Sequence, residues 1–286
     1  MSQVIILGSK GMLGQELVLG FKKFGYDTLG LDQEDIDITD SKDMESKLVP
    51  HKPRIIINAA AYNNVDKIEE SPETYSLARN VNAKAVGNLA SLCRKINTIF
   101  IHYSSDYVFK GDNQSGYSEG SVIDPINKYG ETKAEGEKLL MENGDKYYLI
   151  RLSRLFGKPA TGTDAKKSFV DNIIALAKEG KKTSLDLVDE EYSCPTYAPD
   201  LADFTRELLE SSRPYGIYHG ANSGACTWYE FGKKALELKK IKIDLNPVSG
   251  DKFARPAKRP AFSELLNTRL LAQRRWESAL EEYLFG

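Results

Sequence analysis

Tyr129 and Lys133 are four residues apart in the segment NKYGETKAEGEKLL, which spans residues 127–140. Residues with this spacing share one face of a helix, so a lysine ammonium can stabilise the phenolate form of the tyrosine. Moving a phenol from its usual pKa of about 10 to about 7 requires roughly 4 kcal/mol of such stabilisation. Reduction of a ketone by hydride leaves an alkoxide that a tyrosine hydroxyl can protonate. The pair therefore predicts an acid, Tyr129, with a lysine that tunes it and binds a cofactor ribose.

A second pair with the same spacing, Tyr229 and Lys233, shows that spacing alone does not identify a catalytic couple. Ser105 lies 24 residues before Tyr129, where an apolar run ends, and such a hydroxyl can orient a substrate carbonyl. The hydroxyl 24 residues before Tyr229 belongs to Thr205, in the middle of a predicted helix. We therefore assign the serine, the first tyrosine and its lysine to catalysis, and we interpret Tyr229 as structural.

A glycine-rich loop follows the first apolar run, VIIL at residues 4–7, and precedes a helical pattern. Glycines in this context permit a tight turn, a close approach to a pyrophosphate and close packing of the helix on the strand. The N-terminus of the helix attracts phosphate groups. We expect a dinucleotide to contact the loop and the first helical turn at Gly8, Lys10, Gly11, Met12, Leu13 and Gly14.

Asp32 follows the second apolar run, residues 28–31, and is 24 residues beyond Gly8. A carboxylate at this place binds the adenosine ribose and repels a 2′-phosphate, which favours NADH over NADPH. Lys10 can meet such a phosphate, so the preference stays open with a lean to NADH. Asp37 and Ile38 are expected beside the adenine. The small residues that end the third strand allow close backbone contact with the cofactor at Asn58, Ala59, Ala60 and Ala61.

Alternating patterns in the first half of the chain predict the fold. Apolar runs predict buried strands at 4–7, 28–31, 55–58, 99–103 and 147–152. Amphipathic stretches predict helices at 12–24, 41–49, 73–95 and 128–142. This alternation is typical of an α/β fold with a Rossmann-type doubly wound parallel sheet. We expect 184–188 to add a sixth strand.

The pattern is less regular after residue 152 and predicts a smaller part. Helices are expected at 169–180, 200–210, 227–238 and 268–284, a short strand at 216–222 and an extended loop at 255–262. Thr227 is a plausible N-cap for the third of these helices. We predict a Rossmann domain at 1–152, to which segments such as 169–188 return, and a C-terminal α+β substrate lobe at 189–286. The substrate is expected between the two parts.

Composition excludes several classes of protein. The 286 residues carry 39 basic and 41 acidic side chains, so neither nucleic acid nor a membrane surface is an expected partner. No run approaches the ~18 apolar residues that cross a bilayer, and the start of the chain has no basic region typical of a signal peptide. The three cysteines, at 93, 194 and 226, lack metal-ligand spacing. We expect a soluble cytoplasmic protein.

Taken together, these motifs resemble the extended short-chain dehydrogenase/reductase superfamily. Within it, four further motifs resemble the dTDP-4-dehydrorhamnose reductase family over essentially the whole chain: YSSDYVF with YGETKAEGE (103–137), CPTYAPDLA (194–202), GIYHGANSGACTWYEF (216–231) and RPAKRPAFSELLNTRL (255–270). The resemblance implies reduction by NADH or NADPH of the C4 ketone of a nucleotide-linked 4-keto-6-deoxy sugar. The main candidate is conversion of dTDP-4-dehydro-L-rhamnose to dTDP-L-rhamnose.

The resemblance also implies roles for further residues. Asn82 would line the cofactor, and Ser105 stands where the family usually has threonine. Arg154 stands where many members carry a tryptophan, and it can stack in its place or bind a different nucleotide or sugar. The positions expected at the substrate are Val65, Ser104, Asp106, Tyr107 and Arg154, with Arg255, Lys258 and Arg259 as candidates for the diphosphate.

The resemblance leaves other properties open. Some members bind Mg²⁺ at a dimer contact, for which Glu16, Asp189 and Glu190 are the counterparts here, but we expect no metal site. A homodimer or a monomer is expected. Asp106-Tyr107 lacks the glutamate typical of related dehydratases, which disfavours dehydration. The alternatives are a non-catalytic regulatory or binding subunit with the same fold, as in a regulatory subunit of methionine adenosyltransferase, and a nucleotide-sugar epimerase.

Overall fold

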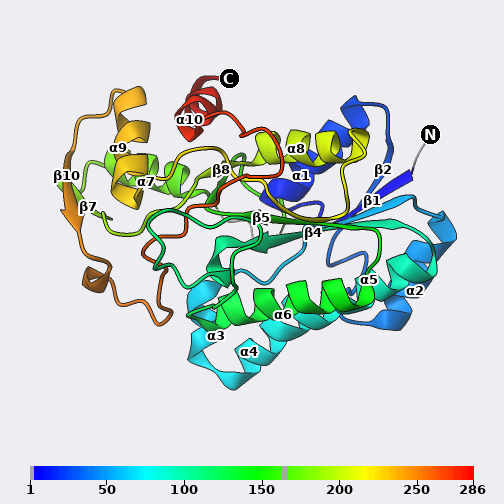
Figure 1. The fold of residues 1–286 in the computed structure, drawn as a ribbon. Coiled ribbons are helices and arrows are strands. Elements are labelled where there is room, and N and C mark those ends of the chain that lie inside the picture. Colours follow the sequence, from blue (N-terminus) through cyan, green and yellow to red (C-terminus); the bar gives the residue numbers. More distant parts are fainter. Residues whose placement is uncertain (1–2, 163–166) are drawn as a thin grey trace.

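The computed structural model describes residues 3–162 and 167–286 and is built around a parallel six-stranded sheet (Figure 1). The strands lie in the order β2-β1-β3-β4-β5-β9. Their bounds are β1 Gln3–Leu7, β2 Asp27–Leu31, β3 Ile55–Asn58, β4 Ile99–Ser105, β5 Tyr147–Leu152 and β9 Gly216–His219. Because the chain leaves β1 outward to β2 and returns to β3, the strand order reverses beside β1. In such sheets the ligand binds at the carboxyl ends of the strands at this point. The predicted α/β, doubly wound fold is confirmed.

Helices cover both faces of this sheet, which separates two apolar cores (Figure 1). One face carries α1 (Met12–Lys23), which packs against α8 (Ala198–Glu210). The other carries α2 (Ser41–Leu48), α5 (Ala85–Lys95) and α6 (Lys128–Asn143). The side chains of Asp40 and Asn127 accept hydrogen bonds from first-turn N–H groups and so fix where α2 and α6 begin.

The stretch predicted as one helix at 73–95 is helical throughout, with a π-helical turn in its middle. It contains α4 (Pro72–Arg79), a π-helical turn at Asn80–Lys84 and α5, and α3 (Val65–Glu70) precedes it. Ser71 separates α3 from α4, because its side chain accepts a hydrogen bond from Thr74 N and Pro72 follows it. The remaining short helical turns are Val49–His51, Asp106–Val108 and Gly250–Lys252.

The C-terminal part contains two small two-stranded sheets that are separate from the main sheet (Figure 1). Its elements are β6 Leu155–Phe156, α7 Phe169–Lys178, β7 Ser184–Val188, β8 Thr196–Tyr197, α9 Trp228–Leu238, β10 Asp244–Val248 and α10 Trp276–Phe285. The prediction of 184–188 as the sixth strand of the main sheet is wrong, because β7 pairs with β10 and the sixth strand is β9. The expected N-cap, Thr227, begins α9 with a capping box. The domain boundary itself stays a prediction.

The predicted helix at 268–284 begins only at Trp276. The residues before it lie across the main sheet's edge and bind other segments. Arg269 donates to Ile217 O at 2.9 Å, and Arg274 forms an ion pair with Asp200. These tertiary contacts hold the segment extended against its local preference for a helix.

Two glycines let α6 lie unusually close to its neighbours. A Cβ on Gly130 would be 2.2 Å from Tyr107 O, and one on Gly136 would be 2.1 Å from Asn82 O. Both distances are far below van der Waals contact, so only glycine fits without displacing backbone. Glycine is otherwise a poor residue for a helix interior. Close packing of α6 is therefore the reason for these two residues.

Gly136→Ala is expected to destabilise the protein by roughly 1–3 kcal/mol, although alanine favours a helix by about 1 kcal/mol over glycine. The clash with Asn82 O outweighs the gain in propensity. Gly20 in α1 is the matched control, because a Cβ there meets no atom within 4 Å. Gly20→Ala should raise the free energy of unfolding by up to about 1 kcal/mol. Urea denaturation measures both, and equal stabilisation by the two changes would contradict the packing argument.

Candidate active site

The glycine loop between β1 and α1 forms a backbone cradle at the carboxyl edge of the sheet. Gly8 has a φ of +74°, and a Cβ there would lie 2.7 Å from Ala60 N. A Cβ on Gly14 would lie 2.0 Å from Gly8 O. No side chain caps the N-terminus of α1 at Gly11. The loop therefore fits a dinucleotide pyrophosphate, which would take hydrogen bonds from the first-turn N–H groups.

Asp32 connects the glycine loop to the end of β2. Its carboxylate accepts hydrogen bonds from Lys10 N at 2.8 Å and from Gln33 N at 2.9 Å. The Lys10 ammonium forms an ion pair with Glu34, and both side chains are about half exposed. Asp32 and Lys10, which we expected to have opposite effects on the choice between NADH and NADPH, are therefore neighbours. The Lys10 ammonium already has an anionic partner in Glu34.

Other residues predicted for the cofactor contribute differently. Leu13 and Ile38 point into the two apolar cores, so only their backbone atoms are available to a ligand. The Asp37 carboxylate accepts hydrogen bonds from Thr39 N and Thr39 Oγ1, which lower its pKa. Met12 is partly exposed in the first turn of α1.

The end of β3 is held by a buried asparagine. Asn58 Oδ1 accepts from Ala60 N at 3.1 Å, and its amide nitrogen lies 3.2 Å from His102 Nδ1. Burial, followed by the charge of Lys133, lowers the pKa of His102, so this ring is neutral and its Nδ1 accepts from the amide. Ala59 and Ala60 are half-buried beside the glycine loop, and Ala61 is exposed.

Asn82 braces the chain beyond β3. Its side-chain amide binds Tyr62 in both directions, accepting from the N–H at 2.9 Å and donating to the C=O at 2.8 Å. It also donates to Thr132 Oγ1 in α6 at 3.0 Å. The side chain is buried and its bonds are internal, so its role at a cofactor would be to position the Tyr62 segment.

Ser105, at the end of β4, is held by a buried carboxylate. Its hydroxyl donates to Asp106 Oδ1 at 3.0 Å and accepts from Tyr107 N at 3.1 Å. Asp106 also accepts from Ser153 Oγ at 3.0 Å and Ser263 Oγ at 2.6 Å. Burial raises the pKa of Asp106, and the three hydroxyls oppose that rise. Asp106 thus orients the serine, and its contact with the substrate stays a prediction.

Tyr129, in the first turn of α6, shares a side-chain hydrogen bond with Ser105. Its ring meets that of Tyr107 edge-to-face, with 5.7 Å between centroids. Burial raises the pKa of Tyr129 to about 12, against the Ser105 bond. This direction is opposite to the lowering that the lysine spacing predicted. A raised pKa keeps the hydroxyl protonated at neutral pH, which is the form that a proton donor requires.

Lys133 lies one turn after Tyr129 and is almost fully buried, with 2 % exposed. Its ammonium donates to Tyr103 O at 2.6 Å, which ties α6 to β4. Burial lowers the pKa of Lys133 to about 8, and the Glu137 carboxylate opposes this. The structure thus brings Ser105, Tyr129 and Lys133 together at the carboxyl end of β4, as expected.

Not every residue predicted for the substrate faces this place. Ser104 is buried and, among the described residues, its Oγ has no hydrogen-bond partner. It lies on the opposite face of β4 from Ser105, because side chains alternate along a strand. Val65 begins α3 and is half-buried, next to Asp66.

Arg154 belongs to a cluster in the C-terminal part. Its guanidinium lies over the Trp228 ring, with 4.0 Å to the centroid, and donates to Cys226 O at 2.7 Å and to Glu191 O. The residue has a φ of +41°, a strained value for a side chain other than glycine. Trp228 Nε1 donates to Glu191 Oε2 at 3.1 Å. An arginine and a tryptophan from distant segments therefore stack here.

Of the three cations predicted for a diphosphate, two have carboxylate partners. Arg255 pairs with Glu191, and Arg259 pairs with Asp66 at 2.8 Å. Lys258 is exposed, and no ion pair is recorded for it among the described residues. The loop that carries them is fixed to α6, because Asn127 donates to Lys258 O at 2.8 Å.

The carboxylates proposed as metal ligands are dispersed. Asp189 accepts from Thr227 Oγ1 at 2.6 Å, and Glu190 accepts from Ser249 Oγ and Gly250 N. Burial raises the pKa of Glu16, in α1. Within residues 3–162 and 167–286, no three histidine, cysteine or acidic side chains form a group that could hold a metal ion. The same residues contain no helix long and apolar enough to cross a membrane.

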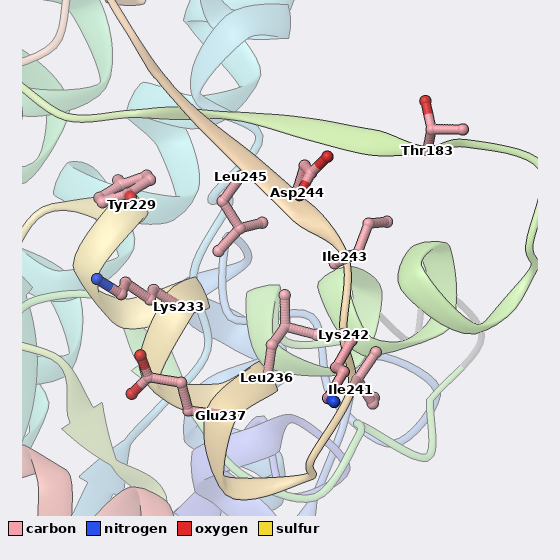
Figure 2. A pocket seen from close by; sticks show the side chains of 10 residues that line it. All are labelled: Thr183, Tyr229, Lys233, Leu236, Glu237, Ile241, Lys242, Ile243, Asp244 and Leu245. Carbon is pink, nitrogen blue, oxygen red and sulfur yellow. The ribbon is translucent and has the colours of Figure 1, made fainter.

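The second tyrosine–lysine pair lies on α9, far from the glycine loop. Tyr229 packs against the apolar cluster between α7, α9 and β7, and Lys233 Nζ is 5.9 Å from the centre of its ring. Figure 2 shows both residues at the rim of a surface pocket of about 600 Å³ between α9 and β10. The pair is thus a contact on a helix face, as expected for structural residues.

Sequence reasoning missed several residues at the site. Ser153, Ser263 and Asp66 come from three separate segments, and nothing in the local sequence indicates that they meet the site. Glu191 and Trp228 were missed for the same reason. A signal did exist for Glu137, which continues the four-residue spacing from Tyr129 through Lys133.

Comparison with known proteins agrees with this arrangement. The model of the RmlD substrate binding domain matches residues 1–285. The chain is 31% identical over 288 residues to the spore coat polysaccharide biosynthesis protein SpsK of Bacillus subtilis, covering 99% of this chain and 97% of that one. It is 33% identical over 291 residues to a dTDP-4-dehydrorhamnose reductase of Streptomyces griseus, with 97% and 91% covered.

A solved structure is similar over its whole length. The dTDP-4-dehydrorhamnose reductase of Bacillus anthracis in complex with NADP has a TM-score of 0.92 and 33% identity, and 99% of each chain is covered. A UDP-glucose 4-epimerase from Thermus thermophilus, at 18% identity and a TM-score of 0.78, shares the fold alone. The family match over residues 1–285 and these full-length likenesses place the chain in the dTDP-4-dehydrorhamnose reductase family.

Proposed function

We propose that the protein is an NAD(P)H-dependent reductase of a nucleotide-linked 4-keto-6-deoxy sugar. The reaction reduces the C4 ketone to an alcohol, and the substrate that the family favours is dTDP-4-dehydro-L-rhamnose, with dTDP-L-rhamnose as product. The observation that carries the proposal is the placement of Ser105 at the end of β4 beside α6, which holds Tyr129 in its first turn and Lys133 one turn further along, where the lysine binds Tyr103 O. This set lies at the same sheet edge as the glycine cradle.

NAD(P)H supplies a hydride to the C4 carbon when it is bound. Tyr129 gives its hydroxyl proton to the ketone oxygen, so that the products are the alcohol and a tyrosinate that water re-protonates. The raised pKa of Tyr129 keeps that proton in place until a stronger base, the developing alkoxide, is present. Ser105 would be the second hydroxyl at the ketone oxygen. Its proton points to Asp106 Oδ1 in this structure and would turn to the ketone oxygen when the substrate binds. Lys133 binds the nicotinamide ribose and stabilises the tyrosinate.

The preference for NADH is a finer part of the proposal. Asp32 lies at the end of β2, where a carboxylate binds a ribose and repels a 2′-phosphate. Glu34 adds a second negative charge and pairs with Lys10, the cation that would otherwise attract the phosphate. The similar reductase of Bacillus anthracis was solved with NADP, so the choice in this chain depends on these local charges.

Cofactor and substrate contacts beyond the catalytic set are also proposed. The cofactor would contact the glycine loop, Asp32 and the Asn58–Ala61 segment. Tyr107 and Arg154 would contact the sugar and its nucleotide. Lys258, which is exposed, would meet the diphosphate. A cytoplasmic location and a homodimeric or monomeric state complete the proposal.

Tyr129→Phe is expected to lower kcat by about 10²–10⁴-fold, the usual contribution of a general acid, and to leave NADH binding nearly unchanged. The ring and its packing against Tyr107 are retained, so only the proton donor is lost. Stopped-flow measurement of NADH oxidation with the dTDP-4-keto sugar gives the rate, and cofactor fluorescence gives the dissociation constant.

Tyr229→Phe is the matched control, because it removes the hydroxyl of the second tyrosine–lysine pair. Its turnover should equal that of the unchanged protein. Normal turnover of Tyr129→Phe would exclude Tyr129 as the acid, and an equal loss in both variants would point to a general effect on folding.

Glu34→Gln is expected to raise kcat/KM for NADPH relative to NADH by up to about fivefold. The change frees Lys10 from an exposed ion pair, whose worth is about 0–1 kcal/mol, to meet a 2′-phosphate. Steady-state kinetics with both cofactors measure the ratio. Glu45→Gln, which breaks the exposed pair with Lys95 on another helix, is the control. An unchanged ratio in Glu34→Gln would remove Lys10 from the determinants of cofactor choice.

A further inference from the structure

A buried ion pair joins α6, the helix that carries Tyr129 and Lys133, to strand β5. Glu137 in α6 and Arg151 in β5 are 0 % and 1 % exposed. The guanidinium binds the carboxylate with two hydrogen bonds, from Nε to Oε1 at 2.9 Å and from Nη2 to Oε2 at 2.6 Å. Replacing a buried ion pair by apolar residues is often neutral or stabilising. Stability alone therefore does not explain why this position holds two charges.

The surroundings of the pair hold the Arg151 guanidinium in place. Arg151 lies over the Phe109 ring, with 5.0 Å to its centroid, and its Nη1 is 3.3 Å from Glu119 O. His219 is neutral, because burial lowers its pKa to about 4. Its Nδ1–H then donates to Leu266 O at 3.0 Å, and its Nε2 faces Arg151 Nη1 as an acceptor at 3.5 Å. The carboxylate of Glu137 is thus held in one direction, and the histidine adds no charge.

Lys133 precedes Glu137 by one turn of α6, so the two side chains share a face of the helix. The charged and titratable groups around Lys133 are Glu137 and Tyr129 on α6 and His102 on β4. Tyr129 is protonated and His102 is neutral. Burial disfavours the ammonium form and lowers the pKa of Lys133 to about 8, and the Glu137 carboxylate is the charge that opposes this.

We propose that Glu137 is a positioning residue that keeps Lys133 charged at neutral pH, and that Arg151 holds the Glu137 carboxylate in place for this purpose. The inference deepens the proposed function, because Lys133 acts on the cofactor ribose and the tyrosinate only as an ammonium. A lysine that loses its proton near neutral pH would bind neither well. A merely structural role of the ion pair predicts no effect on the titration of Lys133.

The test is the titration of the Lys133 side chain in the full-length protein by NMR with ¹³Cε- and ¹⁵Nζ-labelled lysine. The Lys133 signal is assigned by its absence from Lys133→Arg. Glu137→Met/Arg151→Met removes the charges and keeps an apolar core, and Glu137→Gln removes one charge with little change of shape. Thermal denaturation establishes that each variant is folded. Glu135→Gln is the control, because Glu135 lies on the same helix and pairs with Arg79 near the surface.

The titration midpoint of Lys133 should fall by roughly one pH unit in the double variant and in Glu137→Gln, because the buried ammonium loses the carboxylate that opposes its desolvation. Glu135→Gln should leave it unchanged. An unchanged midpoint in either folded Glu137 variant would overturn the inference.

Activity distinguishes this outcome from a failure of the proposed function. In the Glu137 variants, kcat/KM for NADH should fall at pH 7.5 and recover at pH 6.5, where Lys133 regains its proton. A midpoint that shifts in a protein with no reductase activity would reject the function and retain the inference. Reductase activity with an unshifted midpoint of Lys133 would reject the inference and retain the function.

Discussion

The hydrogen bond from Lys133 Nζ to Tyr103 O connects the catalytic helix to the strand that carries Ser105. It forms because α6 approaches the sheet edge closely, and that approach depends on Gly130 and Gly136, whose missing side chains admit the backbone of Tyr107 and Asn82. The serine and the tyrosine come from different elements, so their distance is set by this contact between helix and strand. Packing of α6 thus determines whether the two hydroxyls meet at one substrate oxygen.

Asp106 also joins separate segments of the chain at the site. Its carboxylate receives hydroxyls from the end of β4, from the segment after β5 and from the loop at 255–263. A single buried carboxylate therefore joins the nucleotide-binding part of the chain to the part expected to bind the sugar. The large desolvation cost of such a group is offset only when all three hydroxyls are in place. The orientation of Ser105 depends in this way on residues far from it in sequence.

The strands, the glycine loop and the placement of Tyr129 and Lys133 on one helix were predictable because each depends on a local pattern. β1 to β5 are continuous apolar runs, and Tyr129 and Lys133 have a fixed helical spacing. The exchange of β7 for β9 as the sixth strand was not predictable, since both are short runs and only tertiary pairing decides which of them joins the main sheet. The start of α10 at Trp276 and the pKa direction of Tyr129 have the same origin. The ion pair with Asp200 holds the segment before α10 out of the helix, and burial raises the pKa of Tyr129. A short stretch of sequence shows neither the partner nor the burial.

The pairing of Arg255 and Arg259 with Glu191 and Asp66 has a consequence for which ligands these arginines can bind. A neutral sugar offers these guanidinium groups nothing in exchange for their carboxylates. A ligand with two adjacent negative charges can compete for them, and each arginine that turns toward it releases a carboxylate on α3 or beside β8. Discrimination would then lie in an exchange of ion partners, and free sugars would be rejected because they cannot begin that exchange.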